Sequence, residues 1–512
     1  MPATINGMFP EKYMKKKATV TVIPELRYGN GQAVQGTGAT FQGEKVQGNN
    51  QTISYKVGGN YSMKTNFKYV PEMQKSELYL TFDAYIGSKK VDVPAVKVAD
   101  GIVATSELSG RTVKSAQASV AQDAYQRIIE HKQEANIKFL IQQANLRKSE
   151  LKNNSVKEFV EMLKKINADK EGLNLKNVEV SAYASPDGGL KLNDKLAAQR
   201  QNNTEKFVNK TLKNTKVEAP VDAKYTAQDW EGFQELVKVS DIQDKDVILR
   251  VLSMYKDPEE REQQIKNMSA VFRELADGIL PELRRARLTL NYEVIGRSDA
   301  QIVEQFGNDA SQLSNEELIY GATLVNDAQK EAFYKKAAEL YNDARAYNNL
   351  ATLAFAKGDL SAAKNYAQKA QSVDGSNAES NANLGLIALA EGNVRDAENY
   401  IAKAANAFGL SEIVGNLNLM KGNYAQAEQD FANINSNSAA LAQILNKNYN
   451  AATSTLNNIK NGDATTEYLK AILNARLGNN SAAATALKAA ISKDSSYAKY
   501  AENDLELVNV SK

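Results

Sequence analysis

Hydrophobic and polar positions divide this chain into three regions with different periodicities. Residues 17–99 hold short runs rich in β-branched and aromatic residues, such as ATVTVIPELRY and ELYLTFDAYIG, and glycine-containing turns separate the runs. Runs of this kind at close spacing predict the strands of an all-β domain. We therefore expect a β-sandwich over residues 1–120, with a polar connection at its end.

Strand and helix patterns alternate over residues 121–298. NIKFLI, VEVSAYA and ARLTLNYEVIG are typical of strands, whereas residues 155–168 and 192–212 have the spacing of helices. The apolar face of the first helix is expected to hold Val156, Phe159, Val160, Leu163 and Ile166. This alternation predicts an α/β domain, a sheet with helices on one face, interrupted by a charged helical insertion at about 213–280.

Residues 299–512 are helical in pattern and carry an internal repeat. Gly358 and Gly392 are 34 residues apart, which is the period of tetratricopeptide repeats. The two units also agree at neighbouring positions: Leu350 with Leu384, Ala351 with Gly385, Ala363 with Ala397, and Ala370 with Ala404. An irregular, alanine-rich bundle would not produce this agreement. We expect an α-solenoid of helix–turn–helix units.

The repeat period shortens further along the chain. Gly422 follows Gly392 after 30 residues, Lys447 occupies the next turn position after 25, and Gly478 restores the glycine. We expect about five units, two of them compressed. Residues 495–508 have the pattern of a capping helix, and NEELIYGATLV with KEAFYKKAAELY have that of an entry pair.

Stacked helix pairs form a concave groove that commonly binds an extended or helical segment of a partner. Polar side chains on the first helix of each unit are candidates to face a partner there. The asparagines expected to be exposed on this groove are Asn348, Asn349, Asn381, Asn383, Asn416 and Asn418. Asparagine is also a common solvated residue, which is the alternative for each of them.

Composition excludes several kinds of chemistry. The 512 residues include no cysteine and one histidine, so disulfides, thiolate metal sites and multi-histidine metal sites are impossible. That histidine, His131, lies in a charged stretch that we interpret as a solvated helix. The net charge of +2 gives no footprint for nucleic acid. We expect no cofactor, no metal and no catalysis, because no pair of carboxylates or phosphate loop stands out.

Three smaller features have open interpretations. The lysines of KYMKKK (12–17) either contact phospholipid head groups or form a solvated tail. Arg284, Arg285 and Arg287 form either an anion contact or a polar strand edge. The single tryptophan, Trp230, is expected to anchor the insertion to the core.

The segment VEVSAYASPDGGLKLNDKLAAQRQNNTEKFV resembles the peptidoglycan-binding OmpA-like domain. That family carries a strand ending in Gly-Tyr-Thr-Asp, a glycine-containing loop, and Asn-x-x-Leu-Ser-x-x-Arg-Ala at the start of a helix. Asn193, Leu196 and Arg200 fall at this spacing, with Ala197 in place of the serine. The stretch beginning NIKFLI is similar to the family's first strand and helix, and ARLTLNYEVI to its closing strand.

The resemblance implies a clamp for the zwitterionic end of diaminopimelate. In the family an aspartate meets the amine and an arginine meets the carboxylate, with backbone amides at a helix start assisting the anion. Arg200 corresponds to the arginine. Ser185 stands at the aspartate position, and Asp187 lies two residues later. The alternative is a domain that has kept the fold and lost the ligand, in which Arg200 is an ordinary helix residue.

The loop SAYASPDGG is similar to that of envelope proteins of Bacteroidota, in which an OmpA-like domain with a helical insertion precedes tetratricopeptide repeats. The resemblance implies a periplasmic or outer-membrane-associated protein. The chain starts without the apolar core of a signal peptide, so the protein is either cytoplasmic or has had a signal or lipid anchor removed, and the resemblance favours the second alternative. We expect three domains, over residues 1–120, 121–298 and 299–512, which together form a non-enzymatic envelope scaffold.

In that scaffold the repeats bind a protein partner and the central domain contacts peptidoglycan, with outer-membrane proteins as further candidate partners. The alternative is a pure protein-assembly subunit of an outer-membrane complex that binds no peptidoglycan. The substitution of Ser185 for the family aspartate motivates this alternative.

Overall fold

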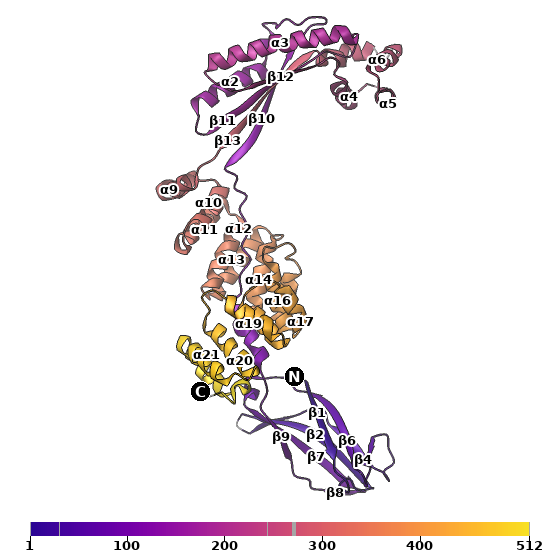
Figure 1. Ribbon diagram of the computed structural model, residues 1–512, viewed down its shortest axis with the longest axis vertical. Helices are drawn as coiled ribbons and strands as arrows, with labels where there is room; N and C mark the ends of the chain where they lie inside the picture. The colour runs from indigo at the N-terminus through magenta and orange to yellow at the C-terminus, as the bar shows by residue number, and fades with distance from the viewer. Residues whose placement is uncertain (1, 30, 243, 269–272, 511–512) are drawn as a thin grey trace. The chain divides into compact units, whose positions relative to one another are not determined.

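The computed structural model describes residues 2–29, 31–242, 244–268 and 273–510. Their contacts define two compact units, one made of residues 1–123 and 325–512 and the other of residues 124–324 (Figure 1). The first unit holds the N-terminal strands and most of the C-terminal helices. The second holds a mixed sheet and its helices.

The N-terminal strands form two sheets around one apolar core. Strand order in the larger sheet is β5-β4-β2-β7-β8, with β3 paired to β2 and β9 to β7, while β1 pairs with β6 alone. Phe9 and Met63 from the small sheet pack with Val22, Phe41 and Leu80 from the large one. The strands are β1 (Pro2–Phe9), β2 (Ala18–Tyr28), β3 (Gln32–Gln35), β4 (Ala39–Gly43), β5 (Gln51–Ile53), β6 (Gly59–Asn66), β7 (Ser76–Ile86), β8 (Lys89–Val91) and β9 (Val96–Asp100). The expected strand content is present.

A short, mostly irregular segment follows β9. It contains the 3₁₀ turn η2 (Thr105–Leu108), helix α1 (Ser109–Thr112) and the 3₁₀ turn η3 (Val113–Ser115), and then runs without regular structure to Arg127. We call residues 102–123 the groove segment, because of where the contacts below place it.

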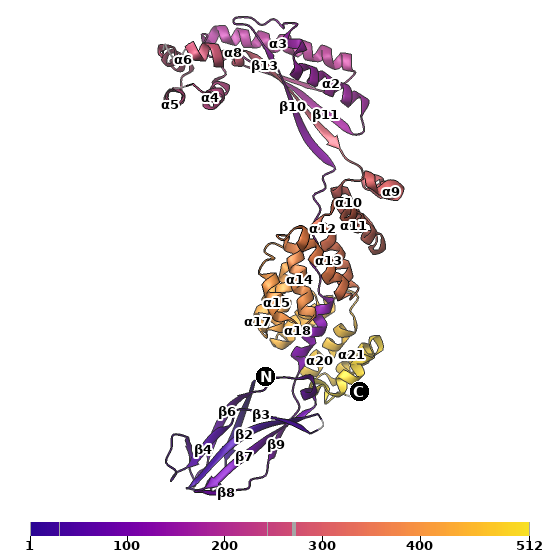
Figure 2. The ribbon, with the colours of Figure 1, turned by 180° about the vertical axis from the view of Figure 1, so that it is seen from behind.

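The C-terminal helices form an α-solenoid of helix pairs (Figure 2). The described part contains five such pairs, each with a first and a second helix packed together. The pairs are α12 (Ala344–Ala356) with α13 (Leu360–Val373), α14 (Ala378–Ala390) with α15 (Val394–Ile401), α16 (Leu410–Met420) with α17 (Tyr424–Asp430), α18 (Asn437–Leu445) with α19 (Tyr449–Asn458), and α20 (Ala464–Arg476) with α21 (Asn480–Lys493). Helix α11 (Asp327–Tyr341) precedes them, and α22 (Ser496–Glu502) with η8 (Leu505–Leu507) follows.

The turns inside these pairs share one backbone conformation. Gly358, Gly392, Gly422 and Gly478 have φ between 77° and 83°, and Lys447 has φ 64° at the equivalent position. This left-handed conformation closes a helix and is easiest for glycine. The prediction that Lys447 occupies a turn position is confirmed. The compressed periods reflect short helices, since α15 and α17 have 8 and 7 residues against 14 in α13.

The second unit is built on a four-stranded mixed sheet of order β10-β13-β11-β12. Strands β11 and β12 are parallel, and β13 runs antiparallel to both β10 and β11. Helices α2 and α3 pack on this sheet and on each other. All five residues expected on the apolar face of α2 contribute to the shared core. The elements are β10 (Ile128–Lys138), α2 (Asn154–Ala168), β11 (Leu173–Tyr183), α3 (Leu190–Thr215), β12 (Val221–Thr226) and β13 (Arg285–Ile295).

A helical insertion lies between β12 and β13 and has its own small core. Its described helices are α4 (Trp230–Val239), α5 (Lys245–Met254), α6 (Pro258–Asn267) and α8 (Leu280–Leu283), with a π-helical turn at Leu275–Ile279. Residues 269–272 of the expected insertion lie outside the described residues. Trp230 packs edge-on against Phe233 within this core. Helices α9 (Asp299–Asp309) and α10 (Asn315–Gly321) complete the unit.

The interpretation of His131 as a helical residue is wrong. His131 lies in β10 opposite Tyr292 of β13, and the two rings stack with their centroids 5.6 Å apart. Strand β10 is at the edge of the sheet, and its first half is exposed. Edge strands tolerate charges on both faces, and such a polar run resembles a solvated helix.

Candidate functional site

The first helices of the repeat pairs hold the groove segment. Helix α1 contacts α14, α16 and α18, while η2 and η3 contact α18 and η3 also contacts α14. First helices line the concave side of such arrays. The groove of this repeat array is therefore occupied, over part of its length, by residues of the same chain.

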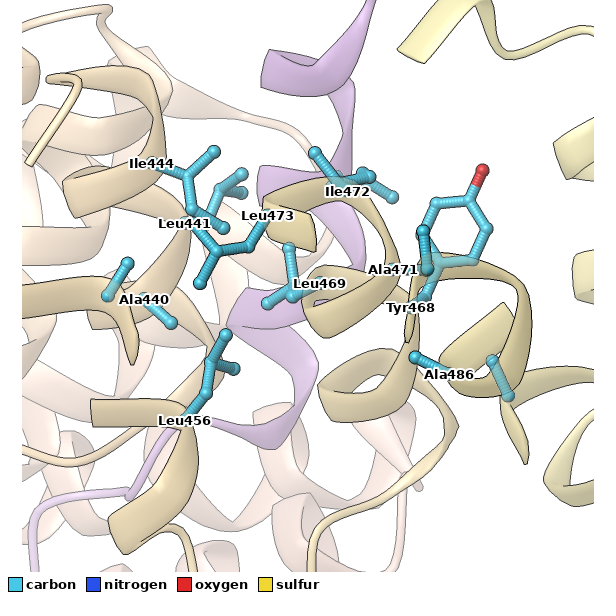
Figure 3. Packing of buried hydrophobic residues seen from close by; sticks show 14 of the residues in the cluster. Ala440, Leu441, Ile444, Leu456, Tyr468, Leu469, Ala471, Ile472, Leu473 and Ala486 are labelled. Atoms are coloured by element: carbon cyan, nitrogen blue, oxygen red, sulfur yellow. The ribbon is translucent and has the colours of Figure 1, made fainter. Parts of the chain in front are cut away.

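Apolar side chains anchor the first half of the groove segment. Leu108 is fully buried and belongs to the core cluster that holds Leu441 and Ile472. Val113 is also fully buried, in the neighbouring cluster around Leu386. Figure 3 shows Leu441, Leu469, Ile472 and Leu473 packed together, with the pale purple ribbon of the groove segment passing beside their helices.

Asparagine side chains hold the second half of the segment through its backbone. Asn349 Oδ1 accepts from the Ala121 amide at 2.8 Å, and its Nδ2 donates to the Ala121 carbonyl at 3.0 Å. Asn383 makes the same pair of bonds with Ser119, both at 2.7 Å. These are the equivalent positions of two consecutive repeats, 34 residues apart. Two adjacent repeats thus bind alternate residues of an extended chain.

Two further polar residues extend this pattern. Asn348 Nδ2 donates to the Ser119 carbonyl at 3.0 Å. One repeat further on, Glu412 accepts from the Gln117 amide at 3.3 Å. Residues 117, 119 and 121 are thus held in turn by α16, α14 and α12. These bonds reach backbone groups of the three residues, which selects an extended conformation, and the Ser119 hydroxyl adds a side-chain bond by donating to the Phe408 carbonyl at 2.6 Å.

Burial raises the pKa of Glu412, and the Gln117 amide lowers it to a smaller degree. Glu412 as a whole residue is 7% exposed. A buried carboxylate with one amide donor is costly when ionised. The groove therefore contains a group whose charge opposes the packed state at neutral pH.

The expectation that the groove asparagines are exposed is wrong. Asn348, Asn349, Asn381, Asn383 and Asn416 are buried, and Asn418 is half-buried. The groove segment covers Asn348, Asn349 and Asn383. The other three bond within the repeats: Asn381 to the carbonyl of Asn377, Asn416 to that of Glu412, and Asn418 to Asp430. Sequence reasoning missed the groove segment itself, whose apolar residues, such as Leu108 and Val113, are scattered through a polar stretch without a helix or strand period.

Part of the groove remains open beside the segment. A cavity of about 830 Å³ lies between the groove segment, the first turns of α16, α18 and α20, and the loops that precede these helices. Its lining is mainly polar and includes exposed Asn435 and Lys460, while exposed Phe408 adds an apolar surface. A chain segment laid here would meet amide donors and acceptors, a lysine and an aromatic ring.

The central-domain motif is built around a buried arginine. Arg200 of α3 is 0% exposed and donates to three backbone carbonyls, of Tyr183 at 2.8 Å, Gln143 at 3.0 Å and Leu140 at 3.3 Å. Its guanidinium also lies 4.9 Å from the ring centroid of Phe139. Burial, and to a smaller degree nearby Arg284, lower the pKa of Arg200 to about 10, while Asp187 acts in the opposite direction. The side chain ties α3 to the loop after β10.

The remaining motif residues form a cluster at the start of α3. Asp187 pairs with Arg284 at 3.1 Å, and Ser185 donates to Asp187 while lying 3.3 Å from Arg284 Nε. Asn193 is buried and donates to the carbonyls of Ser185 and Gly188, both at 2.8 Å. The structure thus brings Ser185, Asp187 and Asn193 together, with Arg284 as an additional member. Arg284 supplies an internal partner for the acid.

The other arginines of LPELRRARL are also paired. Arg285 lies 3.3 Å from Asp229, the residue that caps α4, and Arg287 lies 3.8 Å from Glu134 on β10. Burial raises the pKa of Asp229, and the Gly232 amide and Arg285 lower it. Both arginines thus have partners within the chain, but β13 lies between β10 and β11, so the strand that carries them is not at the edge of the sheet.

The described residues contain no group of three or more histidine, aspartate or glutamate side chains placed to hold a metal ion. Among the helices of the described ranges, none has the length and apolar character to cross a membrane.

Solved structures, rather than family models or curated sequences, supply the proteins to which this chain is similar. No family model matches the sequence, and no curated protein sequence matches it. Solved structures similar to this chain include a tetratricopeptide repeat protein from Parabacteroides merdae, at 14% identity and a TM-score of 0.30, covering 48% of this chain and 99% of that one. PilF of Pseudomonas aeruginosa is 19% identical with a TM-score of 0.29, covering 38% and 97%. YrrB, described as a tetratricopeptide repeat protein with an unusual peptide-binding site, is 20% identical with a TM-score of 0.22, covering 40% and 99%. The repeat assignment rests on the helix pairs and turns of this chain itself.

Proposed function

We propose that this protein is a non-enzymatic assembly scaffold of a Gram-negative cell envelope, and that its repeat groove binds an extended segment of a partner protein. The observation that carries this proposal is the pairing of Asn349 and Asn383 with the backbone of Ala121 and Ser119. It demonstrates, on the chain's own segment, that equivalent positions in successive repeats bind extended polypeptide.

The partner site in this proposal is the open part of the groove. Buried Leu108 and Val113 anchor the groove segment, so in this proposal the partner binds beside the segment and does not displace it. A segment entering the 830 Å³ cavity would lie beside the groove segment, against Phe408, Asn435 and Lys460. The segment and the repeats would then form the binding surface jointly.

The envelope location is supported by the resemblance of the central domain to the OmpA-like family. The segment that resembles the family's first strand begins within the last residues of β10, and the segment that resembles its closing strand forms most of β13. These two strands are paired neighbours in the sheet. The proposal includes this envelope location. It also includes contact with peptidoglycan, which would bind at the cluster of Ser185, Asp187 and Arg284 at the start of α3.

The second candidate is a pure protein-assembly subunit, and the state of Arg200 favours it. Three of its N–H groups are already bonded to backbone carbonyls, and no part of the side chain is exposed. An incoming carboxylate would have to break those bonds. Asp187 is likewise paired with Arg284, so a zwitterion would have to separate that pair.

Site-specific photo-cross-linking in the native envelope tests the groove. A photoreactive residue at Asn435 is expected to give one dominant protein adduct, and the same residue at exposed Lys488 on α21 serves as the control. Phe408→Ala in the Asn435 background should reduce that adduct. Equal adducts at both positions, or none at Asn435, would contradict the proposal.

Sedimentation with purified sacculi separates the two candidates. Arg200→Ala would unfold the site, so the informative variants are Asp187→Asn and Arg284→Gln, whose side chains are partly exposed. Wall contact predicts that the full chain pellets with sacculi and that both variants pellet less. A full chain that stays in the supernatant establishes the assembly-only alternative.

A further inference from the structure

Four turns of the β-domain meet at one end of its sheets. Strand pairing places Ala18 opposite Ile86, so the start of β2 lies beside the end of β7. Backbone amides donate to backbone carbonyls across these turns: Gly87 to Lys17 at 3.0 Å, Lys45 to Lys16 at 2.7 Å, and Lys12 to Tyr55 at 2.6 Å. We call residues 10–17, 44–58 and 86–90 the lysine tip. It is the end at which β4 and β8 are labelled in Figure 1.

The lysine tip concentrates positive charge in a chain that is nearly neutral overall. It carries eight lysines, all exposed, against two acids. The lysines are Lys12, Lys15, Lys16, Lys17, Lys45, Lys56, Lys89 and Lys90. Glu44 is bonded to Ser54, and Lys90 pairs with Asp83 at 3.1 Å. The other seven lysines have no ion pair among the described salt bridges, so the tip presents an uncompensated cationic surface.

An apolar cavity opens at this same end. Its volume is about 530 Å³, and Phe9, Met14, Val20, Phe82, Ala84 and Val96 line it. Lys15 and Tyr13 belong to the lining, and Lys90 lies 5.9 Å from the ring of Tyr85, another lining residue. One acid, Asp92, is also present. A cavity of this size suits a small ligand or a hydrocarbon chain.

Exposed apolar side chains continue outward from the cavity onto the tip. Tyr13 is 65% exposed, Ile86 42% and Val57 80%. Tyrosine and aliphatic side chains among lysines are the composition of protein surfaces that rest at a lipid–water boundary. The tip therefore joins an anion-attracting rim to an apolar interior.

We propose that the β-domain binds an amphiphile with an anionic head group, whose acyl chain enters the cavity while the head group lies among the lysines of residues 12–17 and 89–90. Burial of the chain supplies apolar stabilisation, and the lysines supply charge complementarity and exclude cationic amphiphiles. This binding site is separate from the repeat groove and does not depend on the proposed function. The ligand chemistry is shared by free fatty acids and by anionic membrane lipids.

Titration calorimetry of the full chain with laurate, and with dodecyltrimethylammonium as the cationic match, tests the site. Laurate should bind and the cation should not. Ala84→Phe, which fills the cavity, and Val96→Gln, at a half-exposed lining position that tolerates substitution, should each weaken laurate binding about ten-fold. Binding of both amphiphiles alike, or laurate binding unchanged in both cavity variants, would overturn the proposal.

Co-sedimentation with vesicles identifies the source of the ligand. If membrane lipid is the source, the chain should pellet with phosphatidylcholine vesicles that contain phosphatidylglycerol and not with phosphatidylcholine alone. Changing Lys15, Lys16 and Lys17 to glutamine should weaken this about 100-fold. The control variant changes exposed Lys64 and Lys68 on and after β6. Laurate binding without vesicle binding assigns the site to free fatty acids.

Two results would assign the tip to another ligand class and overturn the proposal. One is a lysine variant that loses vesicle binding while Ala84→Phe and Val96→Gln bind vesicles and laurate normally, which indicates surface charge alone. The other is complete displacement of laurate by polyglutamate, which indicates an acidic peptide.

Discussion

The side-chain amide of Asn349 pairs with both backbone groups of Ala121, accepting from its amide at 2.8 Å and donating to its carbonyl at 3.0 Å. The two residues are separated by 228 positions in the sequence. A single side chain thus replaces the two bonds that a neighbouring strand would supply. Both residues are buried, so water cannot take over these bonds in the packed state.

We expect Asn349→Ala to lower the free energy of unfolding by about 1–3 kcal/mol, because it leaves a buried amide and carbonyl of Ala121 unpaired. Hydrogen exchange should accelerate at residues 117–121. Asn418→Ala is the matched control, since Asn418 is half-buried and bonds to Asp430 rather than to the groove segment. Unchanged exchange at Ala121 in Asn349→Ala would show that the pairing contributes little.

Glu412 gives the groove a dependence on pH. Its pKa in the folded chain is raised, chiefly by burial, above the ordinary value of 4.5. The folded state therefore binds a proton more tightly than the unfolded chain, and this contribution to stability is full below pH 4.5 and is lost as pH rises through the folded pKa.

We expect Glu412→Gln to be more stable than the native chain at pH 7, because glutamine keeps an acceptor for the Gln117 amide without the charge. The difference should shrink toward zero as pH falls below 4.5. Urea unfolding at several pH values measures it. A variant that is less stable at pH 7 would mean that the carboxylate is favourably paired.

Local structure was predictable from the sequence where sequence spacing alone determines it. The apolar face of α2 followed from its spacing, and the turn at Lys447 followed from the repeat period. The groove segment did not, because its partners are distant: Ser119 bonds to Asn383, 264 residues away, and Thr105 to Glu506, 401 residues away. No local periodicity records such contacts.

The central-domain motif shows the same limit at one residue. Spacing identified Arg200 as the position that resembles the arginine of the motif, and the structure places Arg200 on the same helix as Asn193, whose side chain bonds to the Ser185 carbonyl. Its burial depends on the carbonyls of Leu140 and Gln143, which lie in a loop after β10. The direction of a loop carbonyl is set by tertiary structure, so the sequence does not show that Arg200 is fully bonded.

Lys447 is a site at which the chain can be stabilised. Its φ of 64° costs an L-residue about 1 kcal/mol, and glycine adopts it freely. We expect Lys447→Gly to raise the free energy of unfolding by about 0.5–1 kcal/mol, less the added entropy of the unfolded chain. Gly392→Lys is the reciprocal change, since Gly392 has φ 79° and no neighbouring atom within 4 Å of the position that a Cβ would take. It should destabilise by about 1–2 kcal/mol. Changes of the same sign in both variants would contradict this account.

Arg200 should behave as a structural residue. Arg200→Ala removes the donors for three backbone carbonyls, and unpaired buried groups cost about 1–3 kcal/mol each. We expect a loss of several kcal/mol and faster hydrogen exchange around residues 140–143 and 183. Arg284→Gln, in contrast, removes the pair with Asp187 and the bond to the Ser185 hydroxyl, where the paired side chains are 13% and 17% exposed, and should cost less, about 1–3 kcal/mol. An Arg200→Ala chain as stable as the native one would mean that the guanidinium is held for a ligand rather than for the fold.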